Sequence, residues 1–257
     1  MIKNHFFQWG IKYQYEEFDD KLNEWERLDS AGYSLPDAST EILLSKVLKS
    51  QNLITNDRIT GFLQDALSFG NERHEMKVTL GLRSSYRSMS DELLLSPRVQ
   101  LYYKPLMWKS DISFKIAGGI YNQAPLYREL RRPDGSINTQ LKSQKSTQVV
   151  AGLSYDFTWE KISNRPFRII SEIYYKKLED MVSYEVDNVR IRYAGENNST
   201  GYIMGWDFRI NGEFVPGAES WINLSFLSAR EALNGVNHLR YEKIDSVNQQ
   251  VIVSTVP

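Results

Sequence analysis

The sequence RHEMKVTLGLRSSYR, residues 73–87, alternates between two kinds of side chain. Its even positions from 76 to 86 carry Met, Val, Leu, Leu, Ser and Tyr, whereas its odd positions from 75 to 85 carry Glu, Lys, Thr, Gly, Arg and Ser. Successive side chains of a β-strand point to opposite faces, so this pattern predicts a strand with one uncharged face. The alternation outlasts the strands of soluble proteins, which usually run for about five or six residues. It suits a strand that crosses a bilayer with a tilt.

Eight more segments alternate in a similar way, and the connections between them follow a rule. The predicted strands are 3–16, 58–69, 73–87, 92–104, 110–121, 146–160, 166–177, 201–214 and 218–228. Three of the odd-numbered connections are long, with 41 residues at 17–57, 24 at 122–145 and 23 at 178–200, whereas every even-numbered connection has 3 to 5 residues. Short periplasmic turns that alternate with longer extracellular loops are typical of an up-and-down barrel in an outer membrane. We therefore expect the short connections on the periplasmic side.

The composition excludes several classes of protein. The chain has 257 residues, with 31 Lys plus Arg and 32 Asp plus Glu, so its net charge of −1 gives no reason to expect nucleic acid as a partner. No run of apolar residues approaches the roughly 18 that a membrane helix needs, and the mean hydropathy is −0.46. The absence of cysteine removes disulfide scaffolds, thiolate metal sites and cysteine nucleophiles.

A large soluble all-β protein would also alternate, and two features favour a membrane barrel instead. The polar positions are rich in charge, as the wall of a water-filled lumen requires. Tyr and Trp residues gather near the predicted strand ends, where an aromatic girdle would lie. The residues expected to face the lumen are Lys77, Arg83, Lys115, Asp156, Asp207 and Arg209.

Several segments, in order along the chain, resemble the C-terminal barrel of TonB-dependent outer-membrane receptors. They are GLRSSY (81–86), SPRVQLYYKP (96–105), GGIYNQAPLYREL (118–130), residues 138–145 leading into GLSY (152–155), YYKKLEDMV (174–182) and NNSTGYIMGWD (197–207). The resemblance covers nearly the whole chain. It implies an all-β, antiparallel transmembrane barrel of about 22 strands that encloses a plug domain, of which this chain would supply about nine strands.

The same resemblance implies partners and a location. Such a receptor would lie in the outer membrane of a Gram-negative bacterium, in contact with lipid, and its plug would engage the TonB energy-coupling complex. Nothing in residues 1–257 resembles the plug, the TonB box or an aromatic-ended terminal strand. Nine strands that each cross the membrane would also place the two ends of the chain on opposite sides of it, whereas single-chain bacterial barrels have an even number of strands. We therefore expect the chain to be part of one barrel domain, with the plug and the C-terminal strands outside it.

The sequence offers no support for an enzyme. The three histidines, His5, His74 and His238, do not have the spacing of metal ligands. There is no nucleophile elbow, Walker loop or dinucleotide-binding glycine motif. The acidic residues Glu16, Glu17, Asp19 and Asp20 open the predicted 41-residue connection, where solvated charge is the ordinary interpretation. We expect no catalytic residue, no metal site and no cofactor.

Ligand capture by loops remains as a candidate function. The segment YRELRRPDG, residues 127–135, places an aromatic ring and three arginines in a predicted outer loop. Tyr127, Arg128, Arg131 and Arg132 are therefore the candidate ligand-binding residues, because guanidinium groups and aromatic rings recognise anionic or hydroxyl-rich molecules. Alternatively, these arginines hold other loops or bind lipopolysaccharide phosphates.

The sequence thus favours a segment of a receptor that imports a bulky, scarce ligand with energy from TonB. Ferric siderophores, haem, cobalamin, glycans and peptides are the kinds of ligand that remain open. A passive porin-like or adhesive outer-membrane barrel is the first alternative, which a plug domain would distinguish from a receptor. A soluble all-β binding module is the second alternative, and solubility of the chain without detergent would support it.

Overall fold

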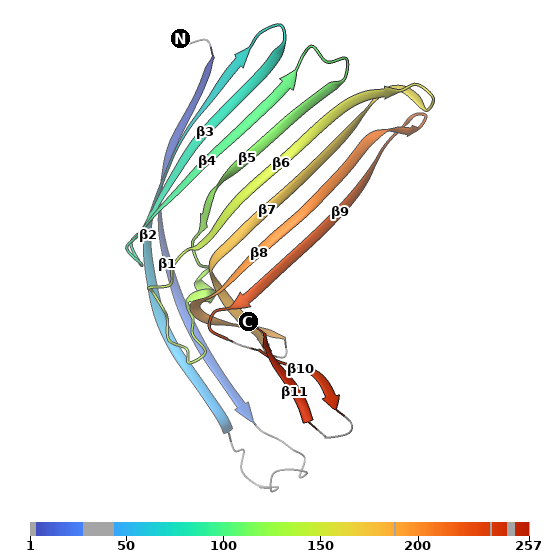
Figure 1. Ribbon diagram of the computed structural model, residues 1–257. Coiled ribbons are helices and arrows are strands. Elements are labelled where there is room, and N and C mark those ends of the chain that lie inside the picture. Colours follow the sequence, from blue (N-terminus) through green and yellow to red (C-terminus); the bar gives the residue numbers. More distant parts are fainter. Residues whose placement is uncertain (1–3, 28–43, 188, 237, 246–249, 257) are drawn as a thin grey trace.

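The computed structural model describes residues 4–27, 44–187, 189–236, 238–245 and 250–256, and no α-helix lies in these ranges. Nine strands form one antiparallel sheet in which each strand pairs with the next strand in the chain (Figure 1). They are β1 (His5–Arg27), β2 (Leu44–Gly70), β3 (His74–Arg87), β4 (Glu92–Pro105), β5 (Asp111–Gln123), β6 (Gln144–Trp159), β7 (Ser163–Asp187), β8 (Arg190–Val215) and β9 (Ala218–Leu233). The prediction of an all-β, up-and-down sheet of nine strands is confirmed.

The two faces of the sheet differ in polarity. Residues directly opposite each other on paired strands share a face, so rows can be followed across the sheet. One row, from β4 to β9, is Leu101, Ile116, Ala151, Ile173, Trp206 and Phe226; the next row on the opposite face is Tyr102, Lys115, Gly152, Glu172, Asp207 and Ser225. The first row is uncharged and largely exposed, with Ile116 at 54% and Phe226 at 56%. An apolar surface of this extent suits contact with lipid.

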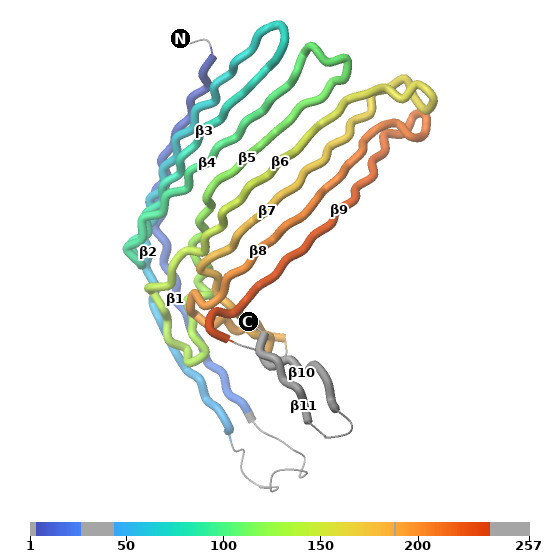
Figure 2. Tube along the Cα trace, in the orientation of Figure 1, coloured from blue at the N-terminus to red at the C-terminus, as the bar shows by residue number. Residues whose placement is uncertain are grey.

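The sheet curves so that its polar face is concave. Figures 1 and 2 show a trough-shaped sheet whose outer strands bend toward each other at one end. At that end Glu24 of β1 forms ion pairs with Arg190 and Arg192 of β8, at 3.0 and 2.9 Å, although six strands lie between β1 and β8 in the sheet. Glu24 lies on the polar side, because it continues the even-numbered positions of β1 that include Lys12 and Gln14. The molecule is therefore a partial barrel with an apolar outer face and a polar inner face.

The predicted alternation of short and long connections does not hold along the whole sheet, because two of the three predicted long loops are mostly strand: β7 ends at Asp187 and β8 begins at Arg190. Most of 17–57 belongs to β1 and β2, and most of 178–200 belongs to β7 and β8. The acidic group from Glu16 to Asp20 accordingly lies within β1 and not in a loop. The cause is that a paired two-stranded ribbon satisfies its backbone hydrogen bonds without an apolar face, so it continues beyond the membrane where the alternation of apolar residues stops.

The predicted 29-residue tail also contains strand. β9 continues to Leu233, and a separate hairpin of β10 (His238–Asp245) and β11 (Gln250–Val256) follows it. The connection predicted at 122–145 is the one that remains a loop over most of its length, with a short 3₁₀ helix, η1 (Tyr127–Leu130). In the described ranges, no helix is long and apolar enough to cross a membrane.

An aromatic cluster marks the short-turn end of the sheet. Phe167 of β7 is fully buried, and its ring lies 5.7 Å from Phe157, 6.0 Å from Trp159 and 5.3 Å from Phe214. Its ring also covers Gly212 of β8, where any Cβ atom would collide with it. These rings are on the outer face, so they form a section of the aromatic girdle that borders the membrane in such barrels.

Candidate ligand site at the long-connection end

The connection between β5 and β6, residues 124–143, folds across the concave face of the sheet, and we call it the inward loop. Its two leucines, Leu130 and Leu141, are 0% and 1% exposed and pack with Ile54 of β2 and Val182 of β7. This is the hydrophobic core in the described part of the chain. The loop thus fills the space between the two halves of the trough instead of projecting away from it.

Local hydrogen bonds give the inward loop its shape. The carboxylate of Glu129 accepts a hydrogen bond from the backbone N–H of Leu126 at 2.7 Å and another from the Gln144 amide at 3.1 Å. Asp134 accepts hydrogen bonds from the backbone N–H and the hydroxyl of Ser136, which closes a turn. Gly135 follows with φ of +85°, a conformation that glycine adopts readily, and it lies against the side chain of Ser50.

A buried arginine fastens the loop to β3 and β4. Arg87 is 2% exposed and donates hydrogen bonds to the backbone oxygen of Leu141 at 2.8 Å and to the hydroxyl of Ser90 at 2.9 Å. It also forms an ion pair with Glu92 at 3.4 Å. Glu92 in turn accepts hydrogen bonds from the backbone N–H and the hydroxyl of Ser143. One charged pair therefore holds the C-terminal end of the inward loop.

A second set of contacts fastens the loop to β1 and β2. The Tyr127 hydroxyl donates a hydrogen bond to Glu16 at 2.5 Å, and Arg131 binds Asp20 through two guanidinium nitrogens. Burial raises the pKa of the Glu16 carboxyl, but hydrogen bonds from Tyr127 and Asn56 and the charge of Arg58 outweigh it, so that this pKa lies below its ordinary value. Burial and the bond to Glu16 raise the pKa of Tyr127, which keeps the phenol protonated as a donor.

A third set joins the loop to the ribbon of β7 and β8. The Asn138 amide donates a hydrogen bond to the backbone oxygen of Gly195 at 2.8 Å. Asn197 accepts a hydrogen bond from the backbone N–H of Lys142 at 2.9 Å and donates one to its oxygen at 3.1 Å. Arg132 lies 3.7 Å from the Glu196 carboxylate. The inward loop is thus tied to three separate hairpins.

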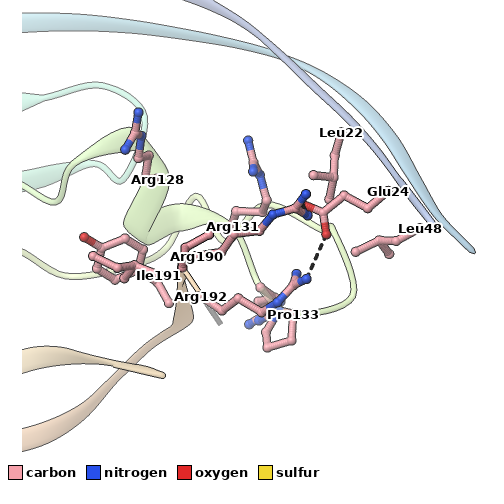
Figure 3. A pocket seen from close by; sticks show the side chains of 12 residues that line it. Leu22, Glu24, Leu48, Arg128, Arg131, Pro133, Arg190, Ile191 and Arg192 are labelled. Carbon is pink, nitrogen blue, oxygen red and sulfur yellow. Dashed lines mark hydrogen bonds and ion pairs between the residues drawn. The ribbon is translucent and has the colours of Figure 1, made fainter. Parts of the chain in front are cut away.

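Between the inward loop and the ribbons β1–β2 and β7–β8 lies a cavity of about 510 Å³, which we call the arginine cavity (Figure 3). Its charged lining consists of Arg128, Arg131, Arg132, Arg190, Arg192 and Glu24. Apolar side chains, including Leu22, Leu48 and Ile191, complete the wall. Arginines from the loop and from β8 therefore line one partly open cavity.

The structure brings together three of the four loop residues that the sequence singled out. Arg128, Arg131 and Arg132 line the arginine cavity, whereas Tyr127 turns to Glu16. The sequence analysis missed Arg190, Arg192 and Glu24, because it placed them in the connections 178–200 and 17–57. Charged residues at alternating positions, such as 190 and 192, were the available signal for a ribbon there.

The register places all six residues expected in the lumen on the concave face. Lys77, Lys115 and Asp207 lie in one row across the sheet, and Arg83 shares the face of Lys77 on β3. Asp156 binds Arg168 through two hydrogen bonds, at 2.5 and 2.7 Å. Arg209 donates a hydrogen bond to Asn211 at 2.6 Å. Within the described ranges, no group of three or more His, Cys, Asp or Glu side chains is placed to hold a metal ion.

Acid is expected to loosen the inward loop. Glu16 has a lower pKa in the folded protein than its ordinary value of 4.5, so its stabilising effect is complete above that value and is lost as the pH falls through the folded-state pKa. A nitroxide label on Thr139→Cys, an exposed position of the loop in a chain without cysteine, reports this by electron paramagnetic resonance. We expect higher label mobility in acid, and a smaller pH response in Glu16→Gln. An unchanged pH response in that variant would contradict the role of Glu16.

The family model "TonB dependent receptor-like, beta-barrel" matches residues 3–250, so the chain belongs to this family of outer-membrane barrels. No curated protein sequence matches the chain. The partial barrel and the family agree with the resemblance seen in the sequence.

Solved structures of outer-membrane transporters share the fold. The copper transporter OprC has 15% sequence identity and a TM-score of 0.56 over 88% of this chain and 36% of its own. The outer membrane transporter YddB from Escherichia coli has 12% identity and a TM-score of 0.59 over 88% of this chain and 31% of its own. The RagAB peptide transporter has 13% identity and a TM-score of 0.50 over 90% of this chain and 28% of its own. The chain thus spans about a third of the length of these proteins.

Proposed function

We propose that this chain forms part of the barrel wall of a TonB-dependent transporter that imports a bulky, scarce ligand across the outer membrane of a Gram-negative bacterium. The observation that carries the proposal is the pairing of an apolar outer face with a charged inner face that the inward loop crosses. A wall of this kind separates lipid from a polar passage. Membership of the receptor family supports the energised form of transport over a passive pore.

The remaining barrel strands and the plug are proposed to come from elsewhere in the same receptor. In the nine-stranded sheet, β1 and β9 are the edge strands, and each unpaired backbone group at such an edge costs several kcal/mol in lipid. Strands added to both edges would satisfy these groups and close the barrel. We propose that the charged inner face, including Lys77, Arg83, Lys115 and Asp207, then faces the plug and the passing ligand.

The proposal is tested by comparing three strains of the native organism in a defined medium: the wild type, a strain that lacks this gene and a strain that lacks TonB. Mass spectrometry measures which solutes each strain removes. Energised import predicts that one class of solute remains in the medium of both mutants. A solute that stays behind only when this gene is missing would indicate a passive pore and would contradict the proposal.

A further inference from the structure

We propose that the arginine cavity is a binding site for a small polyanion that carries carboxylate or phosphate groups on a partly apolar skeleton. This inference rests on the proposed function, whose ligand class it names. The cavity volume of about 510 Å³ falls within the range of roughly 300–1,000 Å³ typical of small-molecule sites. Its lining combines guanidinium groups with the side chains of Leu22, Leu48 and Ile191.

The charges at the cavity favour an anion. Five of its lining residues are arginines and one is acidic, and the fork of a guanidinium group matches carboxylate and phosphate oxygens. Asp20, Glu24 and Asp187 neutralise part of this charge through Arg131, Arg190 and Arg192.

Two arginines retain donors for a ligand. Among the residues that the structure describes, the Arg128 side chain makes no hydrogen bond or ion pair. The Nε atom of Arg132 is buried without a hydrogen-bond partner in the same ranges, and the nearest carboxylate, that of Glu196, is 3.7 Å away. A buried donor without an acceptor is costly, so the guanidinium group of Arg132, a residue that lines the cavity, lacks a full set of partners.

Glu24 marks where an anion would sit. Its carboxylate is held by Arg190 at 3.0 Å and by Arg192 at 2.9 Å, on the wall of the cavity (Figure 3). A ligand carboxylate or phosphate would compete with Glu24 for these two guanidinium groups. Removing the charge of Glu24 should therefore strengthen ligand binding. If the ion pairs of Glu24 were purely structural, its removal would loosen the site and would not strengthen binding.

The position of the cavity favours a dissolved anion over a lipid headgroup. Leu22, Glu24 and Leu48 lie on the inner side of the β1–β2 ribbon, where Glu24 pairs with Leu48 in the register. Lipopolysaccharide would lie against the opposite, convex face. The cavity thus lies at the entrance to the interior, where a solute passes before import.

Isothermal titration calorimetry of the whole receptor in detergent tests the inference, with citrate as the probe and its neutral triethyl ester as the control ligand. The Arg128→Ala/Arg132→Ala double variant is expected to bind citrate about tenfold more weakly or worse. Glu24→Gln is expected to bind citrate severalfold more tightly. Arg73→Ala, which removes an exposed arginine from the turn at the opposite end of the sheet, should bind like the wild type.

Several results would overturn the inference. They are absence of citrate binding, equal binding in the double variant and the wild type, equal or weaker binding in Glu24→Gln, or heat released only with purified lipopolysaccharide. Binding in detergent does not require TonB, so the strain comparison above remains a separate test. A receptor that imports its ligand normally without Arg128 and Arg132 would contradict this inference alone, whereas a receptor that binds citrate but imports nothing would contradict the proposed function.

Discussion

Val99→Arg is expected to destabilise the membrane-embedded receptor by about 2–4 kcal/mol, the cost of an arginine on the lipid face near the bilayer midplane. Val99 lies halfway along β4, between Leu80 and Gly118 on the neighbouring strands, and is 49% exposed on the apolar outer face. A guanidinium group at this position would have to leave water for hydrocarbon. The free energy of unfolding in phospholipid vesicles, from guanidinium titration followed by tryptophan fluorescence, measures the effect.

The neighbouring residue supplies a matched control. Gln100 points to the inner face, between Thr79 and Ala117, so Gln100→Arg places the same charge in the same strand on the polar side. We expect this variant to lose far less stability than Val99→Arg. Equal losses in the two variants would contradict the assignment of the outer face to lipid.

Arg87→Met is expected to release the inward loop, with a cost of about 3–5 kcal/mol, because it breaks a buried ion pair and leaves its partner charge behind. Glu92 would lose its ion-pair partner and the backbone oxygen of Leu141 would lose its donor. Methionine preserves most of the side-chain length, so the change removes mainly charge and hydrogen bonds. Hydrogen–deuterium exchange of residues 124–143 should rise by orders of magnitude.

Arg83→Met is the control for this variant. Arg83 lies on the same strand and the same face as Arg87, but it is exposed and is not part of the ties to the inward loop. Exchange in residues 124–143 should therefore remain at the wild-type rate in Arg83→Met. If both variants, or neither, increased exchange, Arg87 would not be the residue that holds the loop.

The sequence predicted the membrane part of the fold because lipid imposes a strong pattern there. A strand such as 73–87 must present uncharged side chains on one face, and the two-residue period shows which side chains lie on that face. The ribbon ends of β1, β2, β7 and β8 lie outside this constraint. Their side chains meet water or the inward loop, so acidic residues such as Asp19 and Asp20 interrupt the apolar alternation. The sequence pattern therefore predicts a loop where the structure has strand.

The candidate site was only half predictable for a related reason. The arginines at 128, 131 and 132 are close together in the sequence and could be recognised as a group. Arg190 and Glu24 are far apart in the sequence and meet through the curvature of the sheet, which no local pattern contains. The inward direction of the loop likewise depends on Arg87 and on the burial of Leu130 and Leu141, which are contacts between distant segments.

The measurement that tests the central claim most directly is an immunoblot of fractionated native cells, with an antibody raised against this chain. The proposed receptor predicts a band in purified outer membranes that is several times larger than 29.9 kDa, the mass of the chain itself. A band at 29.9 kDa in the soluble fraction would contradict the assignment of this sheet to the wall of an outer-membrane transporter.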